Sequence, residues 1–152
     1  MNMKFASFLL WVTLISHSGF SQTLVGTWKR VSTVLVDKNN VSNDLQKMMA
    51  KSLPCSVKLT YTFEASGIQK TNIPADCKKI MESTASMYAD TKFEFNGKTL
   101  LVLSPKKELF PDAAYQVSFQ GNRMTWVHNF TDNRKDPNPS KTKSITIVYE
   151  KL

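Results

Sequence analysis

The sequence predicts an all-β fold: an eight-stranded up-and-down antiparallel β-barrel with one or two short helices in the long loops at its open end. Two observations lead to this prediction. Eight segments have strand-like patterns, and no connection between them suggests a parallel crossover. The connections are alternately long and short, so in an up-and-down sheet the tight turns would close one end and the long loops surround the other. A two-sheet sandwich is the competing architecture, although sandwiches usually need Greek-key crossings that this loop pattern does not demand.

The N-terminal segment has the features of a secretory signal, so the predicted division is a signal peptide over residues 1–21 and one barrel domain over residues 22–152. Lys4 supplies the positive charge, and the apolar run Phe5 to Ile15 follows it. A membrane anchor is the alternative, but a span needs about 20 apolar residues. The ending Phe20-Ser21-Gln22 resembles signal ends of Gram-negative bacteria. The expected location is therefore secreted or periplasmic, in a Gram-negative bacterium, with no membrane span.

The first half of the domain supplies three predicted strands. Leu24 to Asp37 is the first, and Val41 to Leu53 after it has the apolar spacing of a short helix. Val57 to Glu64 alternates apolar and polar residues, as a half-buried strand does. Ala65-Ser66-Gly67 fits a three-residue hairpin loop, and Ile68 to Ile73 is then the returning strand.

The second half supplies five more strands, after a segment over residues 76–88 that suits a second short helix or a loop. The strands are Thr91 to Phe95, Lys98 to Ser104, Tyr115 to Gln120, Arg123 to Phe130 and Ser144 to Lys151. Asn96-Gly97 and Gly121-Asn122 are two-residue hairpin signals. The first turn would pair Phe93 with Leu100, and the second would pair Val117 with Trp126.

Cys55 and Cys77 are the only cysteines, and an even count in an exported chain favours a disulfide. A three-residue loop centred on Ser66 would place them opposite each other across the second and third strands, at the open end. Two free thiols are one alternative. A metal pair is the other, although two thiolates need two further ligands.

The start of the first strand reads Leu24-Val25-Gly26-Thr27-Trp28. This Gly-x-Trp resembles the signature of the lipocalins, which are calycin-type eight-stranded barrels, and the chain resembles a bacterial secreted, lipocalin-like protein over its whole mature length. The resemblance implies that Trp28 lies at the base of the barrel under a basic residue from the end of the last strand. That residue is Lys151 here, where the family usually has Arg. Gly26, Trp28 and Lys151 are therefore the expected fold signature.

The resemblance also implies a binding function, in which the lumen holds a small apolar or amphipathic molecule such as a fatty acid or pigment. The residues expected to line the lumen are Tyr61, Phe93, Phe95, Tyr115, Val117, Phe119, Trp126, His128 and Ile147. Apolar residues expected at the mouth, between the two long loops 41–53 and 105–113, are Met48, Met49, Leu109 and Phe110. The alternative is an interaction protein of the inhibitor or adaptor type, whose lumen is filled and whose mouth loops bind a protein.

Two polar residues on the apolar face have more than one interpretation. His128 would hold the polar head of a ligand, or it would be a rim histidine bonded to Tyr115. Arg30 shares the face of Trp28 if the strand is regular, and an inward Arg can clamp a carboxylate with two parallel hydrogen bonds. A bulge would instead turn Arg30 outward.

Enzymes and nucleic-acid binders are the classes that the sequence disfavours. Outside residues 1–21, His128 is the only histidine, and the chain lacks Gly-x-Ser-x-Gly, a phosphate-binding glycine loop and Cys-x-x-Cys. We therefore expect no catalytic residues, metal or cofactor. The formal net charge of +8 could suggest nucleic acid. However, lysines alternate with aromatics along the strands and so face the other way, which indicates a solvated outer wall. We expect a monomer that binds no nucleic acid.

Overall fold

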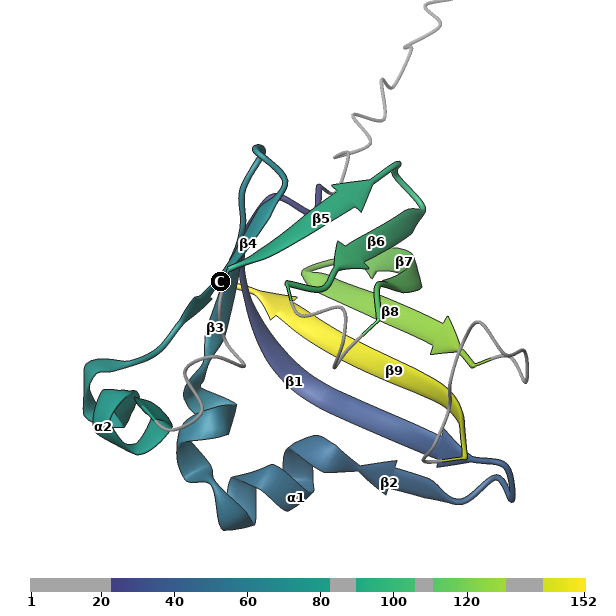
Figure 1. Cartoon of the computed structure of the whole chain (residues 1–152), viewed down its shortest axis with the longest axis horizontal. Helices are drawn as coiled ribbons and strands as arrows, with labels where there is room; N and C mark the ends of the chain where they lie inside the picture. The colour runs from purple at the N-terminus through teal and green to yellow at the C-terminus, as the bar shows by residue number, and fades with distance from the viewer. Residues whose placement is uncertain (1–22, 83–89, 106–110, 131–140) are drawn as a thin grey trace, which may run out of the picture.

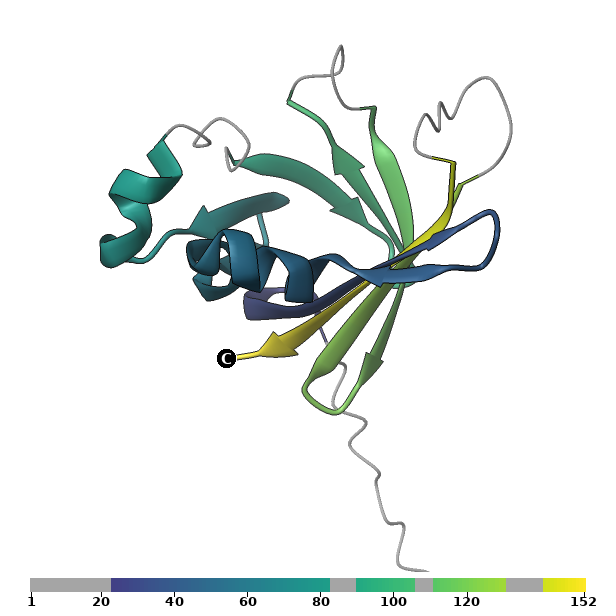
Figure 2. The same cartoon turned by 90° about the horizontal axis from the view of Figure 1, so that it is seen from below.

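The computed structural model describes residues 23–82, 90–105, 111–130 and 141–152, and these form a closed antiparallel barrel of eight strands (Figure 1). The barrel strands are β1 (Gly26–Asp37), β3 (Thr60–Phe63), β4 (Ile68–Asn72), β5 (Thr91–Phe95), β6 (Thr99–Leu103), β7 (Ala113–Gln120), β8 (Arg123–Asn129) and β9 (Thr142–Lys151). Neighbours in sequence pair around the ring, and β9 closes it by lying between β8 and β1 (Figure 2). The predicted fold class is confirmed. The predicted signal peptide lies outside the described residues.

The first long connection holds a ninth strand that the sequence did not predict. β2 (Ser42–Asp44) pairs with the far end of β1, opposite Val34 to Val36. The predicted helix over residues 41–53 is therefore shorter, and α1 spans Leu45–Ser52. Asp44 caps α1, because its Oδ1 accepts a hydrogen bond from the Lys47 N–H at 3.2 Å.

The predicted start of the second strand at Val57 is wrong. Pro54 begins a 3₁₀ helix, η1 (Pro54–Lys58), and its missing N–H suits the first position of a helix. β3 therefore starts at Thr60. Alternation continues only from Leu59 onward, where Leu59, Tyr61 and Phe63 are all buried.

The Cys55–Cys77 disulfide is present, with the two Cα atoms 5.5 Å apart. The bond lies at the open end, as predicted, and it joins two 3₁₀ helices that the sequence did not predict. Cys55 lies in η1, and Cys77 ends a second 3₁₀ helix, η2 (Ala75–Cys77), which continues into α2 (Lys78–Met81). The bond thus holds the two helical connections together at the open end of the barrel, away from the β3–β4 turn (Figure 1).

The predicted pairing between β5 and β6 is wrong by two residues. Phe93 pairs with Val102, and Phe95 pairs with Leu100. The cause is the side chain of Asn96, whose Oδ1 accepts hydrogen bonds from the N–H groups of residues 98 and 99 at 3.1 and 2.8 Å. This moves the two-residue turn one position along the chain. Because the shift in pairing is even, every side chain keeps its face.

The other two hairpins have the predicted register. Phe63 pairs with Gln69 around the three-residue loop, and Val117 pairs with Trp126 in the β7–β8 hairpin. The neighbouring rings of Tyr115 and His128 lie 5.6 Å apart. Local turn chemistry therefore places the inner face of these strands correctly.

Gly67 joins the β3–β4 loop to β5, where the described pairing of β4 with β5 is short. Its carbonyl accepts the Phe93 N–H at 2.8 Å, its φ is +80°, and a Cβ would lie 3.0 Å from the Phe93 carbonyl oxygen. We expect Gly67→Ala to destabilise the protein by about 2 kcal/mol. An alanine is strained at a positive φ, and its Cβ would push the backbone away from the Phe93 carbonyl.

Gly97→Ala is the matched control for this prediction. Gly97 also has a positive φ, of +92°, but no atom would lie within 4 Å of its Cβ. Equilibrium unfolding in urea should therefore give a cost of about 1 kcal/mol for Gly97→Ala, clearly less than for Gly67→Ala. Equal losses would contradict the role given to the Phe93 contact.

Candidate functional site

The closed end of the barrel is built around Trp28, whose side chain is only 2% exposed. Its Nε1 donates a hydrogen bond to the Leu24 carbonyl at 2.8 Å. Lys151 pairs with Trp28 across β1 and β9, and its Nζ lies 5.4 Å from the ring centroid. Gly26 leaves room for this side chain, because a Cβ there would lie 3.2 Å from the Lys151 Cε. The three residues of the expected signature thus form one contact at the base.

Above this base, aromatic rings fill the deep part of the lumen. The Phe63 ring lies 5.5 Å from the rings of Phe93 and Trp126. Tyr149 lies 4.9 Å from Trp126 and 5.7 Å from Tyr61, measured between ring centroids. Of these rings, the predicted lining set omitted Phe63 and Tyr149, although both share the inner face of their strands by simple alternation.

The remaining predicted lining residues lie at different depths. Phe119 and Phe95 lie near the base, because the Phe119 ring is 6.2 Å from Trp28 and 6.3 Å from Phe95. Val117 and Ile147 are buried at the level of Trp126, with which both pair. Val117 and Ile147 belong to the packed core, whereas Phe95 and Phe119 keep part of their surface exposed at the closed end.

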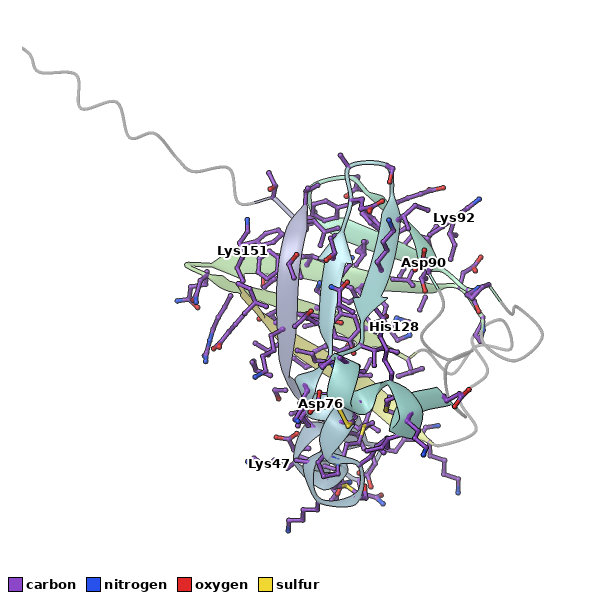
Figure 3. The ribbon with its side chains drawn as sticks, turned by 90° about the vertical axis from the view of Figure 1, so that its left-hand side faces the viewer. Lys47, Asp76, Asp90, Lys92, His128 and Lys151 are labelled. Carbon is purple, nitrogen blue, oxygen red and sulfur yellow. A yellow bond between two sulfur atoms is a disulfide. The ribbon has the colours of Figure 1, made fainter. Side chains whose placement is uncertain are left out.

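Nearer the open end, the inward-facing side chains are only partly buried. Tyr115 pairs with Leu100, and His128 pairs with Ile145, so these residues continue the inner face. Tyr115, His128 and Ile145 nevertheless keep part of their surface exposed. In Figure 3, Lys151 lies at the closed end of the barrel, and His128 lies farther toward the open end. A wall of apolar and aromatic groups therefore stays accessible in this half of the barrel.

His128 is held by its neighbours on this wall. Its Nδ1 lies 2.7 Å from the Ala114 carbonyl oxygen, and its ring stacks edge-on against Phe130 at 4.5 Å. The Tyr115 ring packs beside the His128 ring, and the Ala114 carbonyl is a hydrogen-bond partner of the imidazole. The ring is thus fixed in orientation at the rim, next to the accessible surface.

Arg30 faces into the barrel. A register shift in β1 lies between Arg30 and Ser32, so the bulge comes after Arg30 and does not turn it outward. Arg30 pairs with Tyr149 on β9, and its guanidinium carbon lies 5.4 Å from the Tyr61 ring centroid. The extra residue also changes the phase of the strand, so that Thr33 becomes the next inward side chain, opposite Ile147.

Three buried polar atoms lack a hydrogen-bond partner within the described part of the chain: Arg30 Nε, Thr33 Oγ1 and Trp126 Nε1. All three side chains lie on the inner face, Arg30 and Thr33 on β1 and Trp126 on β8, with β9 between these two strands. Burial raises the pKa of the Tyr149 hydroxyl and also that of Tyr115, so both phenols are neutral near pH 7. The positive charge of Arg30 opposes this rise at Tyr149 but is a smaller effect than burial.

Two pockets open at the ends of the barrel. One, of about 560 Å³, lies between the inner face of β4 and the helical connection, and its walls are Thr71, Ile73, Lys78, Lys79, Met81 and Glu82. The other, of about 530 Å³, lies at the closed end beside Leu24 and Phe95. The expected mouth between two long loops includes Leu109 and Phe110, which lie outside the described residues, while Met48 is 58% exposed on α1.

In the described ranges, no three His, Cys, Asp or Glu side chains gather where they could bind a metal ion. No helix among the described residues is long and apolar enough to cross a membrane. No protein-family model matches the chain, and neither a curated protein nor a solved structure was found to be similar to it.

Proposed function

We propose that this protein is an exported, lipocalin-like binding protein whose barrel holds one small apolar or amphipathic molecule, such as a fatty acid or pigment. The observation that carries the proposal is the accessible inner wall in the open half of the barrel. Val102, Tyr115, His128 and Ile145 point inward and are still partly exposed. A barrel that was packed shut would bury such side chains, because exposed apolar surface is unfavourable in water.

The dimensions of the barrel agree with this function. Eight strands enclose space for side chains or for one small ligand. Here the ring cluster around Phe63 and Trp126 occupies the deep half, which leaves the open half for the ligand. The 560 Å³ pocket beside Thr71 and Ile73 has the size of a small-molecule site and adjoins the same inner face.

Export is part of the proposal. The Cys55–Cys77 disulfide is typical of proteins in oxidising compartments. Residues 1–21 carry the charge and apolar pattern of a cleaved signal.

An interaction protein that acts through its mouth loops is the second candidate. The packed deep lumen favours it, and so do two exposed apolar side chains on the helices of the open end, Met48 and Ile80, each 58% exposed. In that case the mouth would bind a protein surface and the barrel would serve as a scaffold.

Binding of Nile red, a neutral apolar dye, tests the first candidate against the second. We expect one saturable site in the wild-type protein, with a blue-shifted dye emission. Val102→Trp should weaken binding by at least ~10-fold, because an indole at this inward position fills the open half of the lumen. Leu101→Trp, one residue away on the outer face, is the matched control and should bind as the wild type does.

The opposite result would be wild-type protein that binds no dye, together with native mass spectra that show no small molecule retained after purification from the source organism. That outcome would contradict the binding function. The mouth helices would then be the surface to test against protein partners.

A further inference from the structure

We propose that the ligand is an amphipathic anion, with a carboxylate or similarly small oxyanionic head bound by Arg30 and an apolar tail directed to the open end. This inference rests on the proposed binding function and names the chemical class of its ligand. The other residues named in the lumen lining are apolar, aromatic or neutral, and Arg30 supplies the charged contact.

Arg30 is a cation in an apolar setting. It lies against the Tyr61 ring, it pairs with Tyr149 across the strands, and its buried Nε donates to no group in the described structure. Removing a charge from water is costly unless an opposite charge and hydrogen bonds replace the lost hydration. A cation–π contact with Tyr61 offsets part of this cost and leaves the buried Nε donor without an acceptor among the described residues.

The described residues provide no counter-charge for Arg30. Among the acidic residues of the described barrel strands, Glu94 and Glu150 alternate to the outer face, and Asp37 lies at the far end of β1, where its Oδ1 accepts hydrogen bonds from the N–H groups of Asn39 and Val41. Glu64 and Glu150 instead form ion pairs with Lys70 and Arg123 at exposed positions. The neighbouring phenol of Tyr149 is neutral and cannot serve as an anion. Among the described residues no group is placed to serve as an anion for Arg30, and a bound molecule would supply one.

Two neutral donors lie in the next row toward the open end. Thr33 is 6% exposed and Trp126 is 3% exposed, and each pairs with Ile147 from opposite sides. Their Oγ1 and Nε1 atoms are unpartnered within the described residues. A hydroxyl, an indole N–H and a guanidinium are all donors, and a carboxylate is a pure acceptor with several lone pairs. The donor set thus matches an oxyanion better than an alcohol or an amine.

The depth of Arg30 sets the orientation of the ligand. Arg30 lies one inward position above Trp28 at the closed end, while the accessible wall with Tyr115 and Ile145 lies toward the mouth. A head held at Arg30 would therefore reach between the rings of the deep half, at the level of Tyr149, while its tail would lie along that wall in the open half. Arg30 as a whole is only partly buried, although its Nε is buried.

Isothermal titration with three molecules of the same chain length tests this inference: dodecanoate, dodecan-1-ol and methyl dodecanoate. In the wild-type protein we expect dodecanoate to bind about 10- to 100-fold more tightly than either neutral molecule, as for a charge-assisted hydrogen bond. Arg30→Met should remove this preference and leave the affinity for the alcohol unchanged. Arg30→Lys should restore part of it, because it keeps the charge and loses the planar fork.

Arg123→Met is the matched control, because Arg123 lies on the outer face of β8 and is paired with Glu150. It should keep the full preference for the carboxylate. Circular dichroism and thermal unfolding would show whether each variant is folded, and the comparison of acid, ester and alcohol in the wild-type protein needs no variant.

Equal affinity of the wild type for the acid, the ester and the alcohol would overturn the anionic head and leave the binding function intact. A preference that survives in Arg30→Met would also overturn the role of Arg30. Failure of all three molecules and of Nile red to bind would instead contradict the binding function itself.

Discussion

Replacing Trp28 by alanine is expected to lower the free energy of unfolding by about 3–5 kcal/mol, the largest effect of any single substitution discussed for this chain. The side chain is buried at the closed end and packs against Phe119. Its loss leaves a cavity and also removes the hydrogen bond to the Leu24 carbonyl, which is itself in a buried residue. Equilibrium unfolding in urea measures the change.

Two further variants separate the contributions at this site. Trp28→Phe keeps most of the packing and loses the N–H donor, so we expect about 1–2 kcal/mol. Lys151→Ala removes the cation over the indole and should cost about 0.5–1 kcal/mol, because the lysine is exposed. A loss below about 1 kcal/mol for Trp28→Ala would show that the closed end does not depend on this residue.

The inner and outer faces of the strands could be predicted from the sequence because they depend on local chemistry. Alternation in β7 and β8 and the turn between them specify the same register, and the structure has it. The β5–β6 turn shows how far this reasoning extends. Asn96-Gly97 is a strong turn signal, but the Asn96 side chain bonds two backbone N–H groups and moves the turn. The inner and outer faces of β5 and β6 are still as predicted, because the pairing is shifted by two residues, which is an even number.

Elements that depend on tertiary contacts could not be predicted from the alternation of apolar and polar residues. β2 exists because the long strand β1 extends past the short strand β3 and leaves the edge at Val34 to Val36 free for pairing. The 3₁₀ helix at Pro54 interrupts an alternation that reads as strand, and no period-two count detects it. The disulfide was predicted from the number of residues on either side of the β3–β4 loop. It forms between the two 3₁₀ helices that flank these strands.

The candidate site was predicted in composition but not in arrangement. Aromatic side chains on the inner face were expected as a ligand wall, and Phe63 and Trp126 instead pack against each other in the deep half. Arg30 was left with two orientations, because a bulge one residue earlier or later reverses its face. Thr33 was missed for the same reason, since it faces inward only after the bulge. Unpartnered donors can be recognised only when all strands are in place.

Removing the Cys55–Cys77 disulfide is the second large effect that we expect. The two cysteines are 22 positions apart, and a closed loop of this length restricts the unfolded chain enough to stabilise the fold by about 3 kcal/mol. The double variant Cys55→Ala/Cys77→Ala should lose this amount in urea unfolding, with a further loss from the missing sulfur atoms, because Cys77 is fully buried.

Wild-type protein unfolded after reduction is the control, because it keeps both sulfur atoms and lacks only the bond. If closing the loop accounts for most of the stabilisation by the disulfide, the reduced protein should lose nearly as much stability as the double variant. The bond also ties η1 to η2 at the open end, so we expect hydrogen exchange to rise first in residues 54–58 and 75–81 and to change little around Trp28. Uniform exchange throughout the barrel, or a loss below about 1 kcal/mol, would mean that the helical connections hold their place through packing alone.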